Sequence, residues 1–257
     1  MKTQHPNFTR QVLQQFSKNE FKSNSGLFEA IRPYLLKAEK FYLPISGRLF
    51  DDNDFKALDE SEILNLPFPS IVLEYFTEGG KPPFDEGSSS KRMVLVVECS
   101  DRFVCTMFWY SDLKQEWIET LPFVLPRTNY LDPSDRSHLK ILATTECDTT
   151  GYGDAAGSLL SMLNALQCSN VKIEKSKTKK VTVKSALQFD SYNILTIESR
   201  NSSKKPSSGG GSHRSPREHL RRGHIRRLET GRKIWVNAAV IGAGKGAGKI
   251  TKDYRVN

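Results

Sequence analysis

The sequence contains no run of about eighteen apolar residues, the length that a helix needs to cross a membrane, so we expect no membrane span. The first residues, MKTQHPNFTRQVLQQF, lack an apolar region followed by a small-residue cleavage site. A secretory signal has both of these features, and we therefore expect a cytoplasmic protein.

Signatures of catalysis are also scarce. The sequence has no G-x-S-x-G motif, no nucleophilic cysteine pattern and no paired carboxylates, so an enzyme is the less favoured interpretation. The four cysteines form no C-x-x-C pair, and we expect reduced thiols in a protein without a secretory signal. Cys99 and Cys105 flank a predicted turn, and we expect both to fill the core. No cofactor is expected.

Positive charge is abundant, and it is concentrated in the C-terminal third. Residues 200–233 hold eleven Lys or Arg against two Glu, an excess equal to the net charge of +9 of the whole chain. A second basic run, VKIEKSKTKKVTVK, has six lysines and one glutamate. The part before residue 171 is therefore slightly acidic. This asymmetry indicates an anionic partner, which is either RNA or an acidic protein.

The 257 residues are enough to bury a core, and their pattern predicts an α+β fold. Apolar residues at helical spacing predict N-terminal helices over 7–16 and 25–41, with a kink or a restart at Pro33. The acidic stretch DDNDFKALDESEIL, residues 51–64, predicts a third, short helix.

The middle of the chain predicts an antiparallel sheet. Its candidate strands are rich in β-branched and aromatic residues, and they read SIVLEYF, RMVLVVEC, FVCTMFWY and WIETLPFVL. The segment GYGDAAGSLLSMLNALQ predicts a helix that covers this sheet, with Asp154 as its N-terminal cap. A further strand is predicted at YNILTIES.

Composition predicts three parts of the chain. We expect a core domain over residues 1–199, a flexible Ser- and Gly-rich linker over 200–216 and a basic C-terminal segment over 217–257. Within that last segment, the apolar pieces KIWVNAAVIG and ITKDYRV predict the two strands of a hairpin with a glycine-rich loop.

The glycine-rich loop, VIGAGKGAGKIT, matches nucleotide-binding motifs poorly. A dinucleotide-binding motif needs a following helix and an acidic residue about twenty positions on, but only ten residues follow Ala247. A P-loop needs Gly-Lys followed by Ser or Thr, whereas Ile250 follows Lys249. We therefore interpret the segment as a hairpin loop.

The main candidate for function is SPREHLRRGHIRRL, residues 215–228, which contains five arginines and two histidines. Arginine is a planar, permanently charged fork that holds phosphates bidentately, so the segment favours a nucleic-acid interface. The predicted interface residues are Arg217, His219, Arg221, Arg222, Gly223, His224, Arg226 and Arg227.

Three other interpretations of this segment compete. His224 among arginines is a candidate acid or base for cleavage of RNA. A zinc site at His219 and His224 is not expected, because the matching cysteine pair is missing and dense arginine repels a cation. The segment is also compatible with a structural strand, with Gly223 at a turn or bulge and arginines paired to the acidic residues 51–62.

The order of motifs resembles a known family. HLRRGHIRRL, then KIWVNAAVIG, then a final Y-R-V resembles the C-terminal end of a phage and mobile-element family of type V-A anti-CRISPR proteins. The segments LNLPFPSIVLEYF and GSLLSMLNALQCSNVKIEK are similar to further parts of that family. The resemblance implies a functional core of Arg221, Arg222, Gly223 and His224, beside His219 and Arg226. It implies phosphate contacts for the arginines, a tight turn for Gly223, and base contact or proton transfer for His224.

The resemblance also implies a function. It implies a counter-defence protein that lowers the expression of its target, a CRISPR nuclease, through recognition of the nascent peptide and loss of the translated mRNA. The expected partners are a nascent polypeptide, an mRNA or the ribosome, in the cytoplasm of a bacterial host cell. The alternatives are an RNA nuclease that uses His224 and a protein-binding module with a basic face and no RNA role.

Overall fold

The computed structural model describes residues 7–17, 25–49, 62–77, 87–128, 140–141, 150–177, 191–197, 219–221, 224–236 and 239–241. They form two compact units, one within residues 1–164 and 173–194 and the other within residues 165–172 and 195–257. None of the helices in the described ranges is long and apolar enough to cross a membrane. The predicted linker lies outside these ranges, so the domain boundaries at 199 and 217 stay a prediction.

The first unit begins with two helices, α1 (Phe8–Ser17) and α2 (Ser25–Lys37). Both predicted helices are confirmed, and α2 continues through Pro33. The prediction was wrong after Lys37, because residues 39–42 form strand β1 (Glu39–Tyr42). β1 pairs in parallel with the next strand and buries Phe41 completely, so the gain from pairing and burial decides its conformation.

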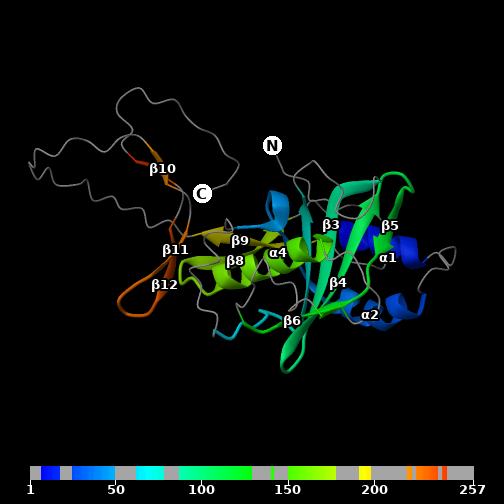
Figure 1. The fold of residues 1–257 in the computed structure, drawn as a ribbon, viewed down its shortest axis with the longest axis horizontal. Coiled ribbons are helices and arrows are strands. Elements are labelled where there is room, and N and C mark those ends of the chain that lie inside the picture. The colour runs from blue at the N-terminus through cyan, green and yellow to red at the C-terminus, as the bar shows by residue number, and fades with distance from the viewer. Residues whose placement is uncertain are drawn as a thin grey trace, which may run out of the picture. The chain divides into compact units, whose positions relative to one another are not determined.

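A mixed sheet forms the centre of this unit (Figure 1). In the described part of the chain its strands run in the order β7-β6-β4-β3-β2-β1-β9-β8, and β5 also pairs with β4. The predicted antiparallel arrangement is confirmed from β2 to β6, whereas β1 is parallel to both β2 and β9. The α+β class is confirmed. The bounds are β2 (Ser70–Phe76), β3 (Ser88–Glu98), β4 (Arg102–Ser111), β5 (Glu116–Glu119), β6 (Phe123–Pro126), β7 (Lys140–Ile141), β8 (Val171–Lys177) and β9 (Ser191–Ile197).

The segment WIETLPFVL, predicted as one strand, is divided between β5 and β6. Phe108 pairs with Glu119 and Cys105 pairs with Phe123, so one extra residue is accommodated opposite β4. The N–H and the hydroxyl of Thr120 at this irregularity both donate to the carbonyl of Met107. The result is a bulge-like irregularity at the point where the partner of β4 changes from β5 to β6.

Helices cover the two faces of the sheet. Val72 packs in one cluster with Phe8 of α1 and Leu35 of α2. Tyr75 projects to the opposite face, as the two-residue period of a strand requires, and lies beside Ser158 of α4 (Thr150–Leu166). The covering helix is thus confirmed, and Figure 1 shows α4 on the side of the sheet away from α1 and α2.

The start of α4 differs from the prediction. The helix begins at Thr150, so Asp154 lies in its second turn and makes an ion pair with Arg48 at 3.2 Å instead of capping the helix. Gly47 packs closely against α4, since a Cβ at this position would clash with the hydroxyl of Ser158. Only a glycine at position 47 fits against this helix.

Two smaller predictions are corrected. Cys105 is buried as expected, but Cys99 is exposed because it lies past the end of β3, at the turn into β4. Of the predicted acidic helix, residues 51–61 lie outside the described ranges. Its last residues are not helical, because Ile63 forms an isolated bridge with Thr128.

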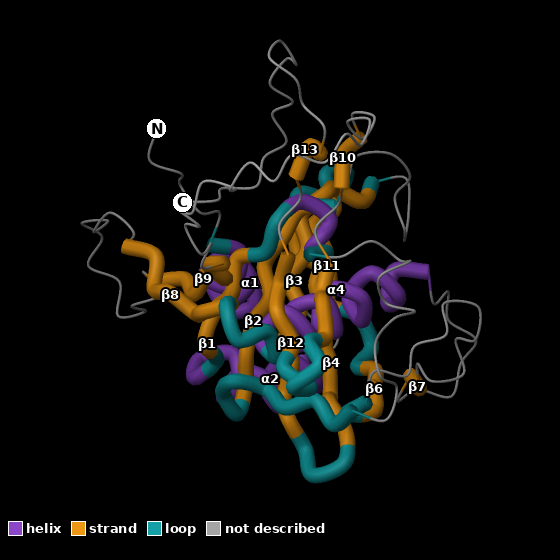
Figure 2. Tube along the Cα trace, turned by 90° about the vertical axis from the view of Figure 1, so that its left-hand side faces the viewer, coloured by secondary structure: helices purple, strands orange, loops and turns teal. Residues whose placement is uncertain are grey.

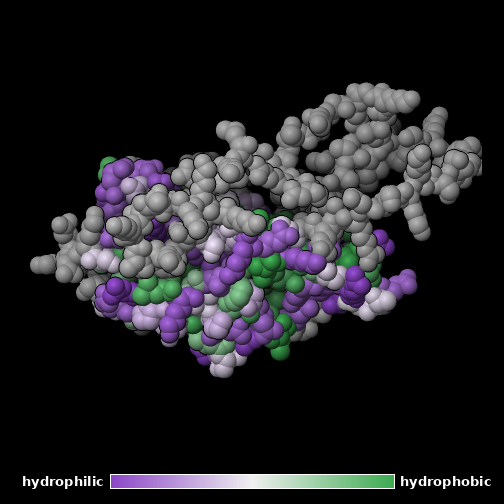
Figure 3. Space-filling view, turned by 180° about the vertical axis from the view of Figure 1, so that it is seen from behind, coloured by the Kyte–Doolittle hydropathy of each residue, from purple (hydrophilic) through white to green (hydrophobic). Residues whose placement is uncertain are grey.

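The described surface mixes polar and apolar residues, and the face in Figure 3 carries no broad hydrophobic area among its coloured atoms. Within the described ranges the exposed large apolar side chains are Tyr34, Leu36, Ile63 and Leu113. Tyr34 and Leu36 both lie on α2, whereas Ile63 forms an isolated bridge and Leu113 lies in the turn between β4 and β5.

Candidate functional site

The arginine-rich segment forms β-strands in the second unit. β10 (His219–Arg221) pairs with β13 (Ala239–Ile241), and β11 (His224–Arg227) pairs with β12 (Lys233–Val236), both antiparallel. Two residues lie between β10 and β11, and two lie between β12 and β13. The register of the β11–β12 pairing therefore continues unchanged into the β10–β13 pairing. We call these described residues, 219–221, 224–236 and 239–241, the basic hairpin. Figure 2 shows β10 beside β13.

This pairing overturns one prediction. KIWVNAAVIG was expected to pair with ITKDYRV, but its residues in β12 and β13 pair with the arginine-rich strand. The segment ITKDYRV lies outside the described residues. A short loop explains the difference, because antiparallel strands that are joined by a tight turn pair most readily with each other.

The turn of the hairpin contains a signal that the sequence interpretation missed. Leu228 N–H donates to the carbonyl of Arg232, and Gly231 N–H donates to the carbonyl of Leu228, both at 2.8 Å. Gly231 has φ +78°, the left-handed conformation that glycine adopts without strain. A three-residue loop with glycine in this position is a common hairpin connection, so Gly231 between two β-rich runs could have predicted it.

The outer edge of β12 is closed by the turn that follows α4. The side-chain amide of Asn170 accepts a hydrogen bond from Trp235 N–H at 2.7 Å and donates one to the Trp235 carbonyl at 2.9 Å. Ser169 N–H donates to the carbonyl of Lys233 at 3.1 Å, and the Ser169 hydroxyl does so at 3.2 Å. These contacts fix the hairpin to residues 167–170 of the same unit.

The cation of β12 is used inside the unit. The Lys233 ammonium donates to the side-chain oxygen of Gln167 at 2.8 Å, and Lys233 is 9% exposed. Arg232, beside it, donates through Nε to the Ser169 hydroxyl at 2.8 Å. β12 therefore stabilises the hairpin but presents no exposed cation on its surface.

β11 differs from β12 in the exposure of its cations. Arg226 and Arg227 are exposed, whereas His224 and Ile225 are half-buried. In register, Arg226 lies opposite Ile234 and Arg227 opposite Lys233, so the two guanidiniums project from opposite faces of the hairpin. The structure thus brings two of the predicted interface residues to an exposed strand.

The other predicted residues are only partly described. His219 and Arg221 lie in β10, and His224 lies in β11 opposite Val236. Arg217, Arg222 and Gly223 lie outside the described residues. The described residues hold no group of three His, Cys, Asp or Glu side chains suited to a metal ion. What the described part of the hairpin offers chemically is exposed guanidinium groups on a rigid strand.

Two further polar centres were not predicted, and both serve the fold. The first is the carboxylate of Glu74 in β2, which is completely buried. It accepts hydrogen bonds from the N–H groups of Phe8 and Thr9 at 2.8 Å and from the hydroxyl of Tyr192 at 2.7 Å. Glu74 therefore caps α1 from the neighbouring sheet, since an anion is favoured at a helix N-terminus. No sequence pattern indicates a cap that is 66 residues away in the chain.

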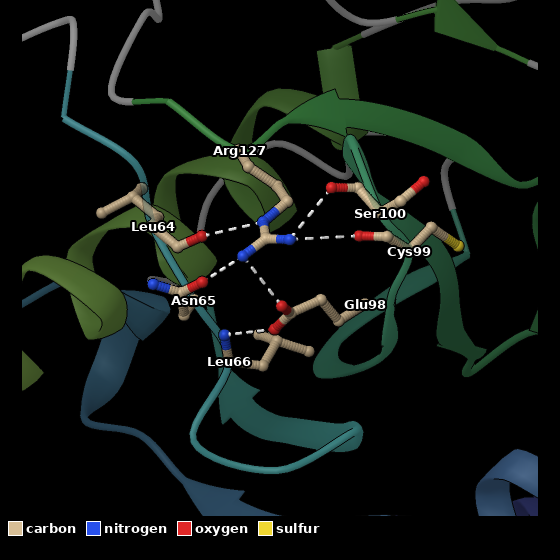
Figure 4. Close-up of polar contacts among 7 residues, drawn as sticks. All are labelled: Leu64, Asn65, Leu66, Glu98, Cys99, Ser100 and Arg127. Carbon is tan, nitrogen blue, oxygen red and sulfur yellow. Dashed lines mark hydrogen bonds and ion pairs between the residues drawn. The ribbon is translucent and has the colours of Figure 1, made fainter.

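The second centre is Arg127, which follows β6 (Figure 4). Its guanidinium donates to the carbonyls of Leu64, Cys99 and Ser100 and to the side chain of Asn65. It also makes an ion pair with Glu98 at 3.0 Å, and the other carboxylate oxygen of Glu98 accepts the Leu66 N–H at 2.6 Å. With all its donors directed at protein groups, Arg127 holds the segment 64–66 against the β3–β4 turn.

Two further titratable groups, Tyr75 and Glu119, are buried in the first unit and affect its stability. Burial raises the pKa of the Tyr75 hydroxyl to about 12. Both carboxylate oxygens of Glu119 are buried without a hydrogen-bond partner among the described residues, and burial raises the pKa of Glu119 to about 7. Glu119 lies opposite Phe108 on the face that α1 and α2 cover.

The comparisons with known proteins identify no relative. No family model matches the chain, and it matches neither a curated protein nor a solved structure. The resemblance to the anti-CRISPR family therefore stays a prediction from the quoted motifs, and the basic hairpin is the candidate site on its own geometry.

Proposed function

We propose that this protein binds RNA through the basic hairpin, and that it is a phage or plasmid counter-defence protein that lowers the expression of its target. The observation that supports RNA binding best is the exposure of Arg226 and Arg227 on one strand. Guanidinium groups are preferred phosphate ligands because their planar donors match two phosphate oxygens at once.

The construction of the hairpin supports this role. β11 is fixed by its ladder with β12, and β12 is fixed by Asn170 and Ser169. A ligand that binds a strand held in this way orders less of the protein than one that binds a free chain, so it loses less affinity to entropy. Binding without catalysis is the simplest role for such a strand.

The expected partners follow from the motif resemblance. A protein that lowers the expression of its target by recognising a nascent peptide meets mRNA and ribosomal RNA at the same place. A basic strand outside the peptide-binding part supplies affinity for that RNA, in the cytoplasm of a bacterial host. The hairpin is accordingly assigned to RNA, and peptide recognition is left to the rest of the chain.

The first test is RNA affinity measured against salt concentration by fluorescence anisotropy. We expect the logarithm of the binding constant to fall linearly with the logarithm of salt, because bound phosphates release counterions. The double variant Arg226→Ala/Arg227→Ala should weaken binding and flatten this slope. Arg32→Ala is the control, since Arg32 is an exposed arginine on α2. A wild-type protein without RNA affinity would leave only the protein-binding alternative.

The second test is co-sedimentation with translating ribosomes from a bacterial lysate, with and without puromycin. Association that puromycin abolishes supports recognition of the nascent chain. Association that resists puromycin but is lost with RNase supports a general RNA contact by the hairpin. Absence of association in both conditions would contradict an action coupled to translation.

A further inference from the structure

Resting on the proposed function, we propose that the RNA on the basic hairpin is single-stranded and runs along the outer edge of β11. Three observations lead to this placement. They concern which edge of the hairpin is closed, where its exposed cations project, and what lies at its tip.

The first observation is the difference between the two edges. Successive residues of an antiparallel strand direct their backbone groups alternately to the partner strand and away from it. On β12, Lys233 and Trp235 point away from β11, and both meet Ser169 and Asn170. The matching outward residue of β11 is Ile225, and no described strand pairs with it on that edge.

The second observation is the direction of the exposed cations. Arg226 and Arg227 project from opposite faces of the hairpin, and β12 offers no exposed cation between Lys233 and Val236. A ligand can meet both guanidiniums only where the two faces meet, at the outer edge of β11. The backbone N–H of Ile225 points to the same edge, as a further donor for a phosphate oxygen.

The third observation excludes insertion of the tip. A two-stranded ribbon that enters the groove of a duplex needs one free face and a tip that tolerates phosphates on both sides. Here Glu229 is exposed at the turn, where its carboxylate repels phosphate, and Arg232 beside it is directed through Nε to Ser169. Lys233 on the Arg227 face is directed to Gln167. An edge with one cation on each side fits a single phosphate backbone rather than two.

The decisive experiment compares one labelled RNA without self-complementarity with its duplex, at the same ionic strength. We expect the single strand to bind at least tenfold more tightly than the duplex. Arg226→Ala and Arg227→Ala should each weaken binding of the single strand roughly tenfold, because each removes one charge-assisted phosphate contact. Each should also lower the salt slope by about 0.7, the value for one phosphate of a single strand.

The outcomes separate the two proposals. Equal or tighter binding of the duplex would overturn the single-strand inference and leave RNA binding intact. Loss of affinity in only one of the two arginine variants would place the RNA on one face and overturn the edge placement. No binding of either RNA, with binding of polyglutamate instead, would overturn the proposed function itself. Circular dichroism of each variant, with Arg32→Ala as control, checks that the fold is retained.

Discussion

Asn170 pairs with Trp235 as a neighbouring strand would, with its side-chain amide accepting the Trp235 N–H and donating to the Trp235 carbonyl. Gln15 does the same for Trp117 of β5, with an accepted hydrogen bond of 2.6 Å and a donated one of 2.7 Å. In both units, a single amide side chain satisfies the outward backbone N–H and carbonyl of one tryptophan on an edge strand. At that residue the edge cannot pair with another chain.

These two amides predict local effects on hydrogen exchange. Asn170→Ala should speed exchange of the Trp235 amide by roughly fivefold and leave the Trp117 amide unchanged, since a lost hydrogen bond is worth about 1 kcal/mol. Gln15→Ala should do the reverse, so that each variant is the control for the other. Amide exchange followed by NMR measures both. Equal effects at both tryptophans would mean that these contacts do not act locally.

Glu74→Gln should destabilise the first unit by about 3 kcal/mol. The amide keeps one acceptor oxygen but directs an NH₂ group at donors from Phe8, Thr9 or Tyr192, so that α1 loses its anionic cap. Urea unfolding at neutral pH measures the change. Glu29→Gln on the exposed side of α2 should change stability by less than about 0.5 kcal/mol. Similar losses in both variants would contradict the capping role.

Glu119 predicts a defined pH dependence. Burial raises its pKa in the folded protein to about 7, above the usual value of about 4.3 for glutamate, so the folded state binds this proton more tightly than the unfolded chain. Its contribution is therefore fully present below about pH 4 and is lost as the pH rises through about 7.

The difference between Glu119→Gln and wild type isolates this contribution. The two proteins should have similar free energies of unfolding at pH 4, and the variant should be more stable by roughly 2 kcal/mol at pH 8, which is less than the full pKa shift implies because Glu119 is partly exposed to screening solvent. Urea unfolding across this range measures the difference, with Glu116→Gln on the same strand as control. A difference that stays constant with pH would show that Glu119 titrates normally.

Arg127→Lys should lower stability by about 2 kcal/mol although the charge is kept. A lysine ammonium is a single point, so it cannot meet the carbonyls of Leu64 and Ser100 and the carboxylate of Glu98 together. Differential scanning calorimetry measures the melting temperature. Arg102→Lys, at an exposed ion pair with Asp101, should leave it almost unchanged. Equal shifts would mean that the geometry of the Arg127 contacts contributes nothing.

The elements that the sequence predicts well are those with a strong local pattern. α1, the strands from β2 to β4 and α4 have apolar residues at helical or alternating spacing, and the structure has all of them. β1 escaped prediction because four residues carry too little pattern, and its conformation depends on pairing with β2. The cap at Glu74 escaped prediction for the same reason, since the partners meet only in the folded sheet.

The residue types of the candidate site could be read from the sequence, but the pairing of its strands could not. Charge and residue type indicate an anionic partner, and two of the residues selected on that ground, Arg226 and Arg227, are exposed. A structural strand was one interpretation of this segment, but KIWVNAAVIG was assigned to ITKDYRV, so the true pairing was missed. The contacts of Asn170 and Ser169 with β12 could not be predicted, because they join residues about 65 positions apart.

The continuous register of the basic hairpin limits how its sequence can change in length. Arg221 and His224 on one strand, and Val236 and Ala239 on the other, are separated by equal numbers of residues. One residue added or removed on a single strand would turn every side chain of β10 or of β13 to the other face, because side chains alternate along a strand. Insertions and deletions in this part of the gene should therefore be found in matched pairs, one on each strand.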